Sequence, residues 1–273
     1  MSALDFRQKW MLITGASSGL GAEMARQLAL QFQTNLIVVA RREAKLLALK
    51  TELEALAKVE VKVKSADLSI PEQVDRVITE SLTEVDLYGI VLNAGTTYFG
   101  QHRALAWEQF NTIMQTNIMG LMRMIHPAIA HFEETQKPGG ILIVSSMAAF
   151  SPVPYQAAYS ATKAFLSNFA NALSHELSNP QFSITVFEPG GIATEMTANE
   201  KFNELRGWMM PVNTAAREGL WAFQQRKYRY VPGFFNRIGG FLMRLLPGQF
   251  IASRMAKVYR KALAAAEKQA AEK

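Results

Sequence analysis

Short apolar runs alternate with longer amphipathic stretches along roughly the first 190 residues of the chain. Most of these runs are rich in Val, Ile and Leu and have few polar positions, which is typical of strands buried on both faces. Residues 59–66 differ, because apolar and polar residues alternate there with a period of two, as in an edge strand. We expect strands at 10–14, 35–40 and 59–66, within 89–95, 139–146 and 182–190, and a last one within 228–233.

The stretches between these runs have apolar residues at helical spacing. Pro71 opens one of them, at a position where its missing N–H costs nothing. We expect helices over 19–32, up to about residue 57, from Pro71 onward, over 105–136 and over 155–178. The alternation predicts an α/β fold: a doubly wound parallel sheet of the Rossmann type, with about seven strands, helices on both faces and a C-terminal helical lid.

The segment TGASSGLG, residues 14–21, follows the first predicted strand and opens the first predicted helix. Gly15, Gly19 and Gly21 have the spacing G-x-x-x-G-x-G, which differs from the usual G-x-G-x-x-G dinucleotide fingerprint. The physical logic is shared, because glycines let the backbone turn tightly and approach a pyrophosphate at the helix N-terminus. We therefore predict a dinucleotide site here rather than an ordinary glycine-containing turn.

The residues after the second predicted strand indicate which dinucleotide binds. In NAD sites an acidic residue about 20 positions beyond the glycines bonds the ribose 2′-hydroxyl, but here Arg41 and Arg42 occupy that place. A guanidinium pairs with a 2′-phosphate, so the sequence favours NADP (NADPH). Asp67, after the third strand, would either accept a bond from an adenine amino group or cap the next helix.

The segment YSATK places Tyr159 and Lys163 one helical turn apart in an apolar setting. A free tyrosine has a pKa of about 10, which is too high for efficient proton exchange at neutral pH. An ammonium beside a phenol lowers the pKa of that phenol, so we expect Lys163 to make Tyr159 a usable acid or base. Ser146, at the end of a predicted strand, would hold the reacting oxygen by a hydrogen bond.

Five features in this order resemble the short-chain dehydrogenase/reductases in their shorter, single-domain branch: TGASSGLG, LNAG, Asn117, the serine pair that ends at Ser146, and YSATK. The resemblance covers residues 10 to about 195. Ser146 lies 13 residues before Tyr159, as the serine of that family does, and PGGIAT (189–194) matches the family's segment beside the nicotinamide. Leu92 stands where the family often has a second asparagine.

The resemblance implies a catalytic set of Asn117, Ser146, Tyr159 and Lys163. Tyr159 would protonate a carbonyl oxygen during reduction or take the alcohol proton during oxidation, while the cofactor supplies the hydride. Lys163 would also bond the nicotinamide ribose, and Asn117 would hold a water that relays protons to Lys163. With the glycine loop and the arginines, the expected cofactor-binding residues are Gly15, Ser17, Ser18, Gly19, Leu20, Gly21, Arg41, Arg42, Asp67, Leu68, Asn93, Ala94, Gly95, Tyr159, Lys163, Pro189, Gly190, Ile192 and Thr194.

We predict a single domain over residues 1–273, because no linker, repeat or low-complexity segment divides the chain. Residues 1–194 would form the dinucleotide-binding and catalytic core, and 195–260 the substrate lid with the C-terminal helices. Residues 261–273 have the composition of a fraying helix end. The chain shows no signal-peptide pattern, no apolar run of membrane-spanning length and no cysteine, from which we expect a cytoplasmic protein.

The net charge of +6 is unevenly spread. Residues 1–199 carry 15 Lys+Arg and 18 Asp+Glu, whereas residues 200–273 carry 14 and 5. Such asymmetry marks an anionic partner in some proteins, although a solvated face is the commoner reason, and no nucleic-acid module is recognisable. We expect no metal site, because ligand-like spacing is missing from the four histidines, His102, His126, His131 and His175.

Residues 195–260 are rich in methionines and aromatics, which suit an apolar substrate unless they are plain core. They include Trp208, Met209, Met210, Trp221, Phe234, Phe235, Phe241 and Met243. Residues 238–259 repeat apolar pairs at helical spacing with basic residues between them. Such a segment lies on an anionic membrane surface in some proteins; we favour packing on its own domain or on another subunit.

These patterns together predict an NADP-dependent oxidoreductase that interconverts a carbonyl and a secondary alcohol, as a reductase of an apolar ketone or acyl-type substrate. The resemblance implies a homodimer or homotetramer. Two alternatives stay open: an NAD-dependent alcohol dehydrogenase of the same fold, and a non-catalytic regulator that binds NADPH.

Overall fold

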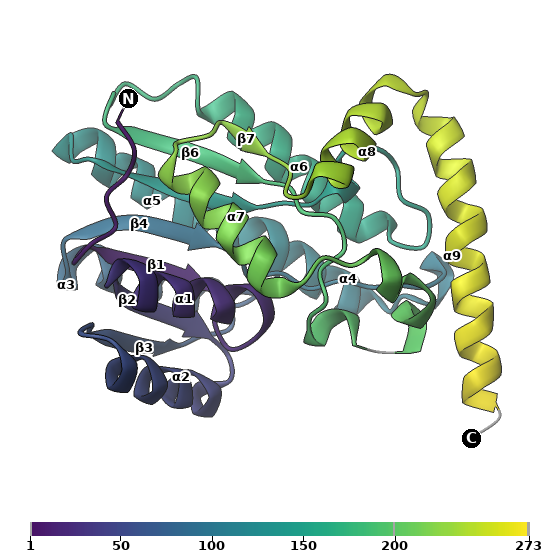
Figure 1. Cartoon of the computed structure of the whole chain (residues 1–273), viewed down its shortest axis with the longest axis horizontal. Helices are drawn as coiled ribbons and strands as arrows, with labels where there is room; N and C mark the ends of the chain where they lie inside the picture. The colour runs from purple at the N-terminus through teal and green to yellow at the C-terminus, as the bar shows by residue number, and fades with distance from the viewer. Residues whose placement is uncertain (1, 199, 272–273) are drawn as a thin grey trace.

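The computed structural model describes residues 2–198 and 200–271, and they form a seven-stranded parallel sheet in the order β3-β2-β1-β4-β5-β6-β7 (Figure 1). The predicted doubly wound α/β fold is therefore confirmed, with residues 61–65 at one edge as the alternating pattern indicated. The strands are β1 (Trp10–Thr14), β2 (Asn35–Ala40), β3 (Val61–Ser65), β4 (Leu87–Leu92), β5 (Gly139–Val144), β6 (Phe182–Phe187) and β7 (Arg229–Tyr230).

Helices cover both faces of this sheet (Figure 1). On one face, α1 (Gly19–Phe32), α2 (Glu43–Leu56) and α7 (Val212–Gln224) pack on strand residues such as Ile13 and Val38. On the other, α3 (Pro71–Glu84), α5 (Gly120–Thr135) and α6 (Ala157–Leu173) pack on Leu12 and Ile37. Successive strand side chains point to opposite faces, so runs with no polar position supply two separate apolar cores.

The strand order reverses beside β1, which pairs with β2 on one side and β4 on the other. In open α/β sheets this reversal leaves a crevice outside the carboxyl ends of the strands, where ligands bind. The glycine loop follows β1, Arg41 follows β2, Asn93 follows β4, Ser146 follows β5 and Pro189 follows β6. The fold thus gathers segments that lie far apart in the sequence at one edge of the sheet.

The segment predicted as one helix over 105–136 has two helices with a π-helical turn between them. Helix α4 spans Trp107–Met114, the π turn spans Gln115–Met119, and α5 follows. The helix predicted over 155–178 is shorter and ends at Leu173.

The C-terminal quarter adds α8 (Phe234–Leu245) and α9 (Gly248–Ala271), drawn in yellow-green and yellow in Figure 1. Helix α9 packs on the 3-10 segment Glu200–Trp208. The composition predicts a frayed tail from residue 261 onward. Residues 261–266 do not fit this prediction, because they belong to α9 and Ala262, Leu263 and Ala266 are buried. Residues 272–273 lie outside the described part of the chain. Among the described helices, none has the length and apolar content needed to cross a membrane.

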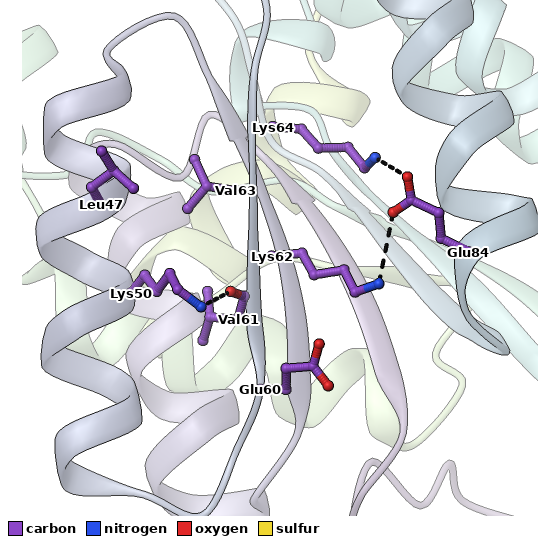
Figure 2. Close-up of a pocket in the computed structure, with 8 residues that line it drawn as sticks. All are labelled: Leu47, Lys50, Glu60, Val61, Lys62, Val63, Lys64 and Glu84. Atoms are coloured by element: carbon purple, nitrogen blue, oxygen red, sulfur yellow. Dashed lines mark hydrogen bonds and ion pairs between the residues drawn. The ribbon is translucent and has the colours of Figure 1, made fainter.

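A groove runs along the edge strand β3 between α2 and α3 (Figure 2). Its lysines are engaged: Lys64 contacts Glu84 at 3.0 Å, and Lys50 Nζ donates to the Val61 carbonyl at 2.6 Å. Charged side chains on an edge strand discourage pairing with another sheet. None of the predicted site residues lines this groove, so we treat it as edge protection.

Candidate active site

The glycine loop has a backbone that only glycine adopts without strain. Gly15 and Gly19 have φ values of +68° and +55°, in the left-handed region. A side chain on Gly15 would come within 2.8 Å of Asn93 Nδ2 and 3.0 Å of the Ala94 backbone. One on Gly21 would collide with the Gly15 carbonyl oxygen. The G-x-x-x-G-x-G spacing therefore follows from how tightly this loop packs on the end of β4.

Asn93 braces that loop with its side chain. Its Nδ2 donates to the Thr14 carbonyl at 3.1 Å and to the Gly15 carbonyl at 3.4 Å. The Thr14 hydroxyl in turn accepts from the backbone N–H groups of Asn93 and Ala94, both at 3.0 Å. Asn93 and Ala94 thus lie beside the predicted cofactor groove, and Asn93 holds the loop in shape.

The N-terminus of α1 offers unpaired donors to an anion. Ser18 is the N-cap residue, but its side chain makes no capping bond to the helix. Its hydroxyl instead accepts from Arg42 Nη2 at 2.6 Å. The first-turn N–H groups of a helix need outside acceptors, and phosphate oxygens supply them. The loop, with Leu20 buried behind it, fits a dinucleotide pyrophosphate.

Two basic residues of the β2–α2 segment gather beside this loop. Arg42 donates to the hydroxyls of Ser17 and Ser18 and, through Nη1, to Glu195 at 2.9 Å. Lys45 reaches the same carboxylate at 2.7 Å. These bonds hold the pKa of Glu195 down at about 2. Lys45 and Glu195 were not predicted from the sequence. Lys45 lies about one helical turn after Arg42, the N-cap of α2, and this spacing could have indicated that the two side chains lie close together.

Arg41 points to the other side, towards Asp67. Its side chain is 68% exposed and its Nη1 lies 3.6 Å from Asp67 Oδ2. Asp67 Oδ1 accepts from the Ser69 N–H at 2.9 Å and the Ser69 hydroxyl at 2.7 Å. Burial alone would raise the pKa of Asp67, but the bonds from Ser69 and the nearby Arg41 lower it overall. The predicted capping role is wrong, because Ile70 is the N-cap of α3.

Asn117 sits at the π turn, fully buried. Its Oδ1 accepts from the Thr96 N–H at 2.8 Å, and its Nδ2 donates to the Thr96 carbonyl at 2.9 Å and to Thr162 Oγ1 at 3.1 Å. Single π turns inside helices are frequent at functional sites. The amide locks the segment after β4 to α6, so its side chain is a structural tie between two walls of the site.

Ser146 and Tyr159 face each other across the end of β5. A hydrogen bond with the Ser146 hydroxyl lowers the pKa of the Tyr159 phenol, but burial has the larger effect and raises that pKa overall. Ser146 Oγ also accepts from the Ala148 N–H at 3.1 Å and donates to the Pro189 carbonyl at 3.4 Å. The Ser146 hydroxyl thus lies beside the Tyr159 phenol.

Lys163 lies one turn further along α6, and only 4% of it is exposed. Its Nζ donates to the Val144 carbonyl at 2.8 Å and lies 5.7 Å from the centre of the Tyr159 ring. Burial lowers the pKa of Lys163 to about 8. The expected lowering of the Tyr159 pKa by Lys163 is absent in this arrangement, because burial raises that pKa overall and the group that lowers it is Ser146.

The remaining predicted cofactor residues lie on segments that border the site. A side chain on Gly19 would meet Thr194 Cβ at 3.2 Å, and one on Gly95 would lie 3.6 Å from Lys163 Nζ. Ile192 pairs with Met210 by a β-bridge. The Leu68 carbonyl abuts Gly120, and Gly190 abuts Asn236. Every predicted cofactor residue thus lies on the β-strand carboxyl edge or on a segment that borders it.

Tyr259 of α9 was missed by sequence reasoning, which had no means to place the last helix. It lies near enough to Tyr159 to raise the pKa of that phenol slightly, and burial raises the pKa of Tyr259 itself. Its ring packs on Phe99 at 5.1 Å between centroids, in an apolar cluster with Phe202 and Leu263. The site is therefore bounded on this side by aromatic residues.

The lid residues that were expected to suit an apolar substrate largely point elsewhere. Five of the eight are exposed: Trp208, Trp221, Phe234, Phe235 and Phe241. Met209 packs with the Phe99 and Phe202 cluster instead. The apolar wall near Tyr159 comes from that cluster, which includes Tyr259, and not from the five exposed residues.

No group of His, Asp and Glu among the described residues has the arrangement of a metal site.

Comparisons with known proteins agree with this geometry. The model of the short chain dehydrogenase family matches residues 9–204. The human protein named inactive hydroxysteroid dehydrogenase-like protein 1 is 31% identical over 205 residues, which are 74% of this chain and 62% of the human protein. The very-long-chain 3-oxoacyl-CoA reductase of Meyerozyma guilliermondii is 35% identical over 178 residues, 62% of this chain and 52% of that protein. The chain thus matches little more than half of the length of these relatives.

A solved short-chain dehydrogenase from Sphingobium yanoikuyae in complex with NADPH superposes with a TM-score of 0.78 and 26% identity, over 87% of this chain and 94% of that one. Similar structures hold NADPH in some cases and NADH in others. The family match covers well over half of the chain. The fold is the one that the sequence motifs implied. This chain belongs to the short-chain dehydrogenase/reductase family of oxidoreductases.

Proposed function

We propose that this protein is an NADP-dependent oxidoreductase that reduces a carbonyl to a secondary alcohol by hydride transfer. The observation that carries the proposal is the placement of the Ser146 hydroxyl beside the Tyr159 phenol at the end of β5, with buried Lys163 one turn along α6. A purely structural tyrosine would not need a second hydroxyl aimed at its phenol and a buried amine beside it.

The protonation of Tyr159 favours reduction over oxidation. Because burial raises its pKa, the phenol keeps its proton at neutral pH and donates it to a carbonyl oxygen that gains charge. The Ser146 hydroxyl holds that oxygen by a second hydrogen bond. Lys163 Nζ lies between the Val144 carbonyl and the Gly95 backbone and would bond a ribose hydroxyl of the cofactor. NADPH, when bound, supplies the hydride.

The cofactor choice follows from charge. Arg42 bonds Ser17 and Ser18, Lys45 bonds the same Glu195 carboxylate as Arg42, and Arg41 faces Asp67. All three basic residues follow β2, where an NAD site has an acidic residue. Arginine forks pair with phosphate oxygens in a bidentate way, so these side chains suit the 2′-phosphate of NADP. The Sphingobium relative solved with NADPH supports the same choice.

We further propose an apolar ketone or acyl-type substrate. The aromatic cluster of Phe99, Phe202 and Tyr259 supplies an apolar wall close to the reacting phenol. A relative named 3-oxoacyl-CoA reductase acts on a substrate of this type, which is consistent with that wall.

A non-catalytic NADPH-binding regulator is the competing function, because one relative is named inactive. The test uses Tyr159→Phe, with Tyr228→Phe as control, since the Tyr228 phenol bonds Asn171 away from the site. We expect Tyr159→Phe to bind NADPH as the wild type does while NADPH-dependent reduction of a panel of ketones and 3-oxoacyl thioesters falls at least about a hundredfold. Wild-type binding of NADPH without turnover on any member of the panel would favour the regulator.

A further inference from the structure

Helix α8 exposes a continuous apolar face. Its residues lie at i, i+3, i+4 and i+7 spacing on one side of the helix, and each is at least 45% exposed. We call them the α8 apolar face: Phe234, Phe235, Ile238, Phe241, Leu242 and Leu245. The sequence favours packing of this segment on its own domain or on another subunit; in the structure, the described residues of the chain leave this face exposed.

The opposite side of α8 touches the candidate site. Gly240 is buried, and a side chain there would meet the Phe150 ring at 2.8 Å. Gly190, next to the Pro189 carbonyl that Ser146 contacts, abuts Asn236 of α8. The helix therefore has one face on the wall of the site and the other on the outside of the molecule, at the end that Figure 1 shows with α9.

The segment around this face is strongly basic in sequence. Between Glu218 and Glu267 the chain has no acidic residue and nine basic ones: Arg226, Lys227, Arg229, Arg237, Arg244, Arg254, Lys257, Arg260 and Lys261. Arg237 and Arg244 border the apolar face along one side of α8. Arg244 stacks on Phe150 at 4.1 Å and pairs with Glu188 at 3.4 Å. On α8 and on α9 up to residue 261, in the described part of the chain, the cations without an acidic partner are therefore Arg237, Arg254, Lys257, Arg260 and Lys261. The apolar side continues past α8 to Leu246 and Phe250, 44% and 48% exposed, with Arg254 over the Phe250 ring.

We propose that the α8 apolar face docks this protein on an anionic lipid bilayer, with α8 lying in the plane of the membrane surface. An in-plane helix with Phe and Leu on one side and Lys or Arg at its border is the arrangement that binds anionic lipid interfaces. A second copy of the chain fits less well, because two such faces would bring two segments of the same positive charge together.

This orientation presents the site to the source of a lipophilic substrate. Only the thickness of α8 separates the bilayer from Met147, Phe150 and Gly190, which adjoin Ser146 and Pro189. The docking itself does not depend on the proposed function, since it needs neither cofactor nor turnover. Failure of either proposal leaves the other standing.

Vesicle co-sedimentation of the full chain without cofactor tests the proposal. Vesicles of phosphatidylcholine alone are compared with vesicles that also contain phosphatidylglycerol, at low and at high salt. We expect binding to the anionic vesicles only, weakened by salt. Phe235→Ser/Phe241→Ser should lose binding at least about tenfold. The control Leu47→Ser/Leu56→Ser alters two exposed apolar residues of α2 and should bind as the wild type does.

A second pair of variants tests the charge. Arg254→Gln/Lys257→Gln should weaken binding to anionic vesicles by about tenfold or more, because each basic residue near an anionic surface contributes about fivefold. The control Arg7→Gln/Lys58→Gln removes two basic residues outside α8 and α9, one before β1 and one after α2, and should have little effect on binding. Circular dichroism verifies that each variant is folded.

Three results would overturn the proposal. One is a wild-type protein that stays in the supernatant with anionic vesicles at low salt. Another is equal binding of the wild type and Phe235→Ser/Phe241→Ser. The third combines two results: the wild type is a dimer in sedimentation velocity but does not bind vesicles, and Phe235→Ser/Phe241→Ser is a monomer. That outcome would assign the face to a second copy of the chain.

Discussion

Arg42 holds Glu195 across the predicted mouth of the cofactor groove, with Nη1 2.9 Å from Oε2. The same guanidinium bonds Ser17 and Ser18 of the glycine loop. One ion pair thus links the loop after β1, the start of α2 and the segment that leads from Thr194 into the C-terminal quarter. Glu195 occupies the donors that a 2′-phosphate would use if the proposed NADP site is correct, so it would then compete with that phosphate.

Glu195→Gln should therefore tighten NADPH binding about two- to fivefold, because the competing surface carboxylate is removed. Affinity for NADH, which lacks the 2′-phosphate, should stay unchanged. Isothermal titration calorimetry with both cofactors measures the difference. Glu54→Gln, which removes a comparable carboxylate 2.6 Å from Lys50, serves as control. An equal gain for NADH would show that Glu195 acts on loop shape and not on phosphate binding.

Ser146→Ala should lower kcat for carbonyl reduction about 10²- to 10³-fold, as expected for the loss of one donor to a developing oxyanion. It also removes the hydrogen bond that lowers the pKa of Tyr159, so that pKa should rise further. Ser145→Ala is the control, since the Ser145 hydroxyl bonds the Lys163 carbonyl at 2.9 Å, away from the phenol. Steady-state kinetics with saturating NADPH compare the two. Similar losses of kcat in both variants would contradict the assigned role.

Lys163→Met should stabilise the fold at about pH 7 while turnover is lost. Burial lowers the pKa of Lys163 from 10.5 to about 8, so the charged form is penalised in the folded state. This penalty lowers the free energy of unfolding of the wild type by about 3 kcal/mol. It is fully present below about pH 8 and disappears as the pH rises towards 10.5. Loss of the bond to the Val144 carbonyl offsets about 1 kcal/mol of the gain.

Urea unfolding of the wild type and of Lys163→Met at about pH 7 and at about pH 9.5 measures this effect. The stability advantage of the variant should be smaller at the higher pH. A variant that is less stable by the same amount at both pH values would show that Lys163 stabilises the fold through its hydrogen bond alone.

Gly21→Ala should lower the free energy of unfolding by about 1–3 kcal/mol, because the new methyl group collides with the Gly15 carbonyl and forces the loop to move. NADPH affinity should fall with it. Gly207→Ala is the matched control, since nothing lies within 4 Å of the added atom. Denaturant unfolding and cofactor titration are run on both. Wild-type affinity in Gly21→Ala would mean that the pyrophosphate does not sit on this loop.

The sequence predicted the sheet, its edge strand and the site segments because these depend on local patterns. Apolar runs define buried strands, and the carboxyl ends of parallel strands meet at one edge whatever the details of packing. Tyr159 and Lys163 are one helical turn apart, so their shared face needed no tertiary information.

The remaining features depend on tertiary contacts. Glu195 meets Lys45 across 150 positions of sequence, and no local pattern signals such a pair. The raised pKa of Tyr159 comes from burial, which sequence spacing does not reveal. The same holds for Tyr259 and for the outward side of α8, because helical periodicity shows that a face is apolar but not what it contacts.

The most direct test of the central claim follows the hydride. NADPH deuterated at the transferring position of nicotinamide C4 is incubated with wild-type protein or Tyr159→Phe and the carbonyl substrate that gives the highest turnover, and the product is analysed by mass spectrometry. We predict one deuterium on the carbinol carbon with the wild type and none above background with Tyr159→Phe, although both bind NADPH. Equal deuterium transfer by the two proteins would contradict the role of Tyr159, and no transfer to any carbonyl by NADPH-bound wild type would contradict the enzymatic function itself.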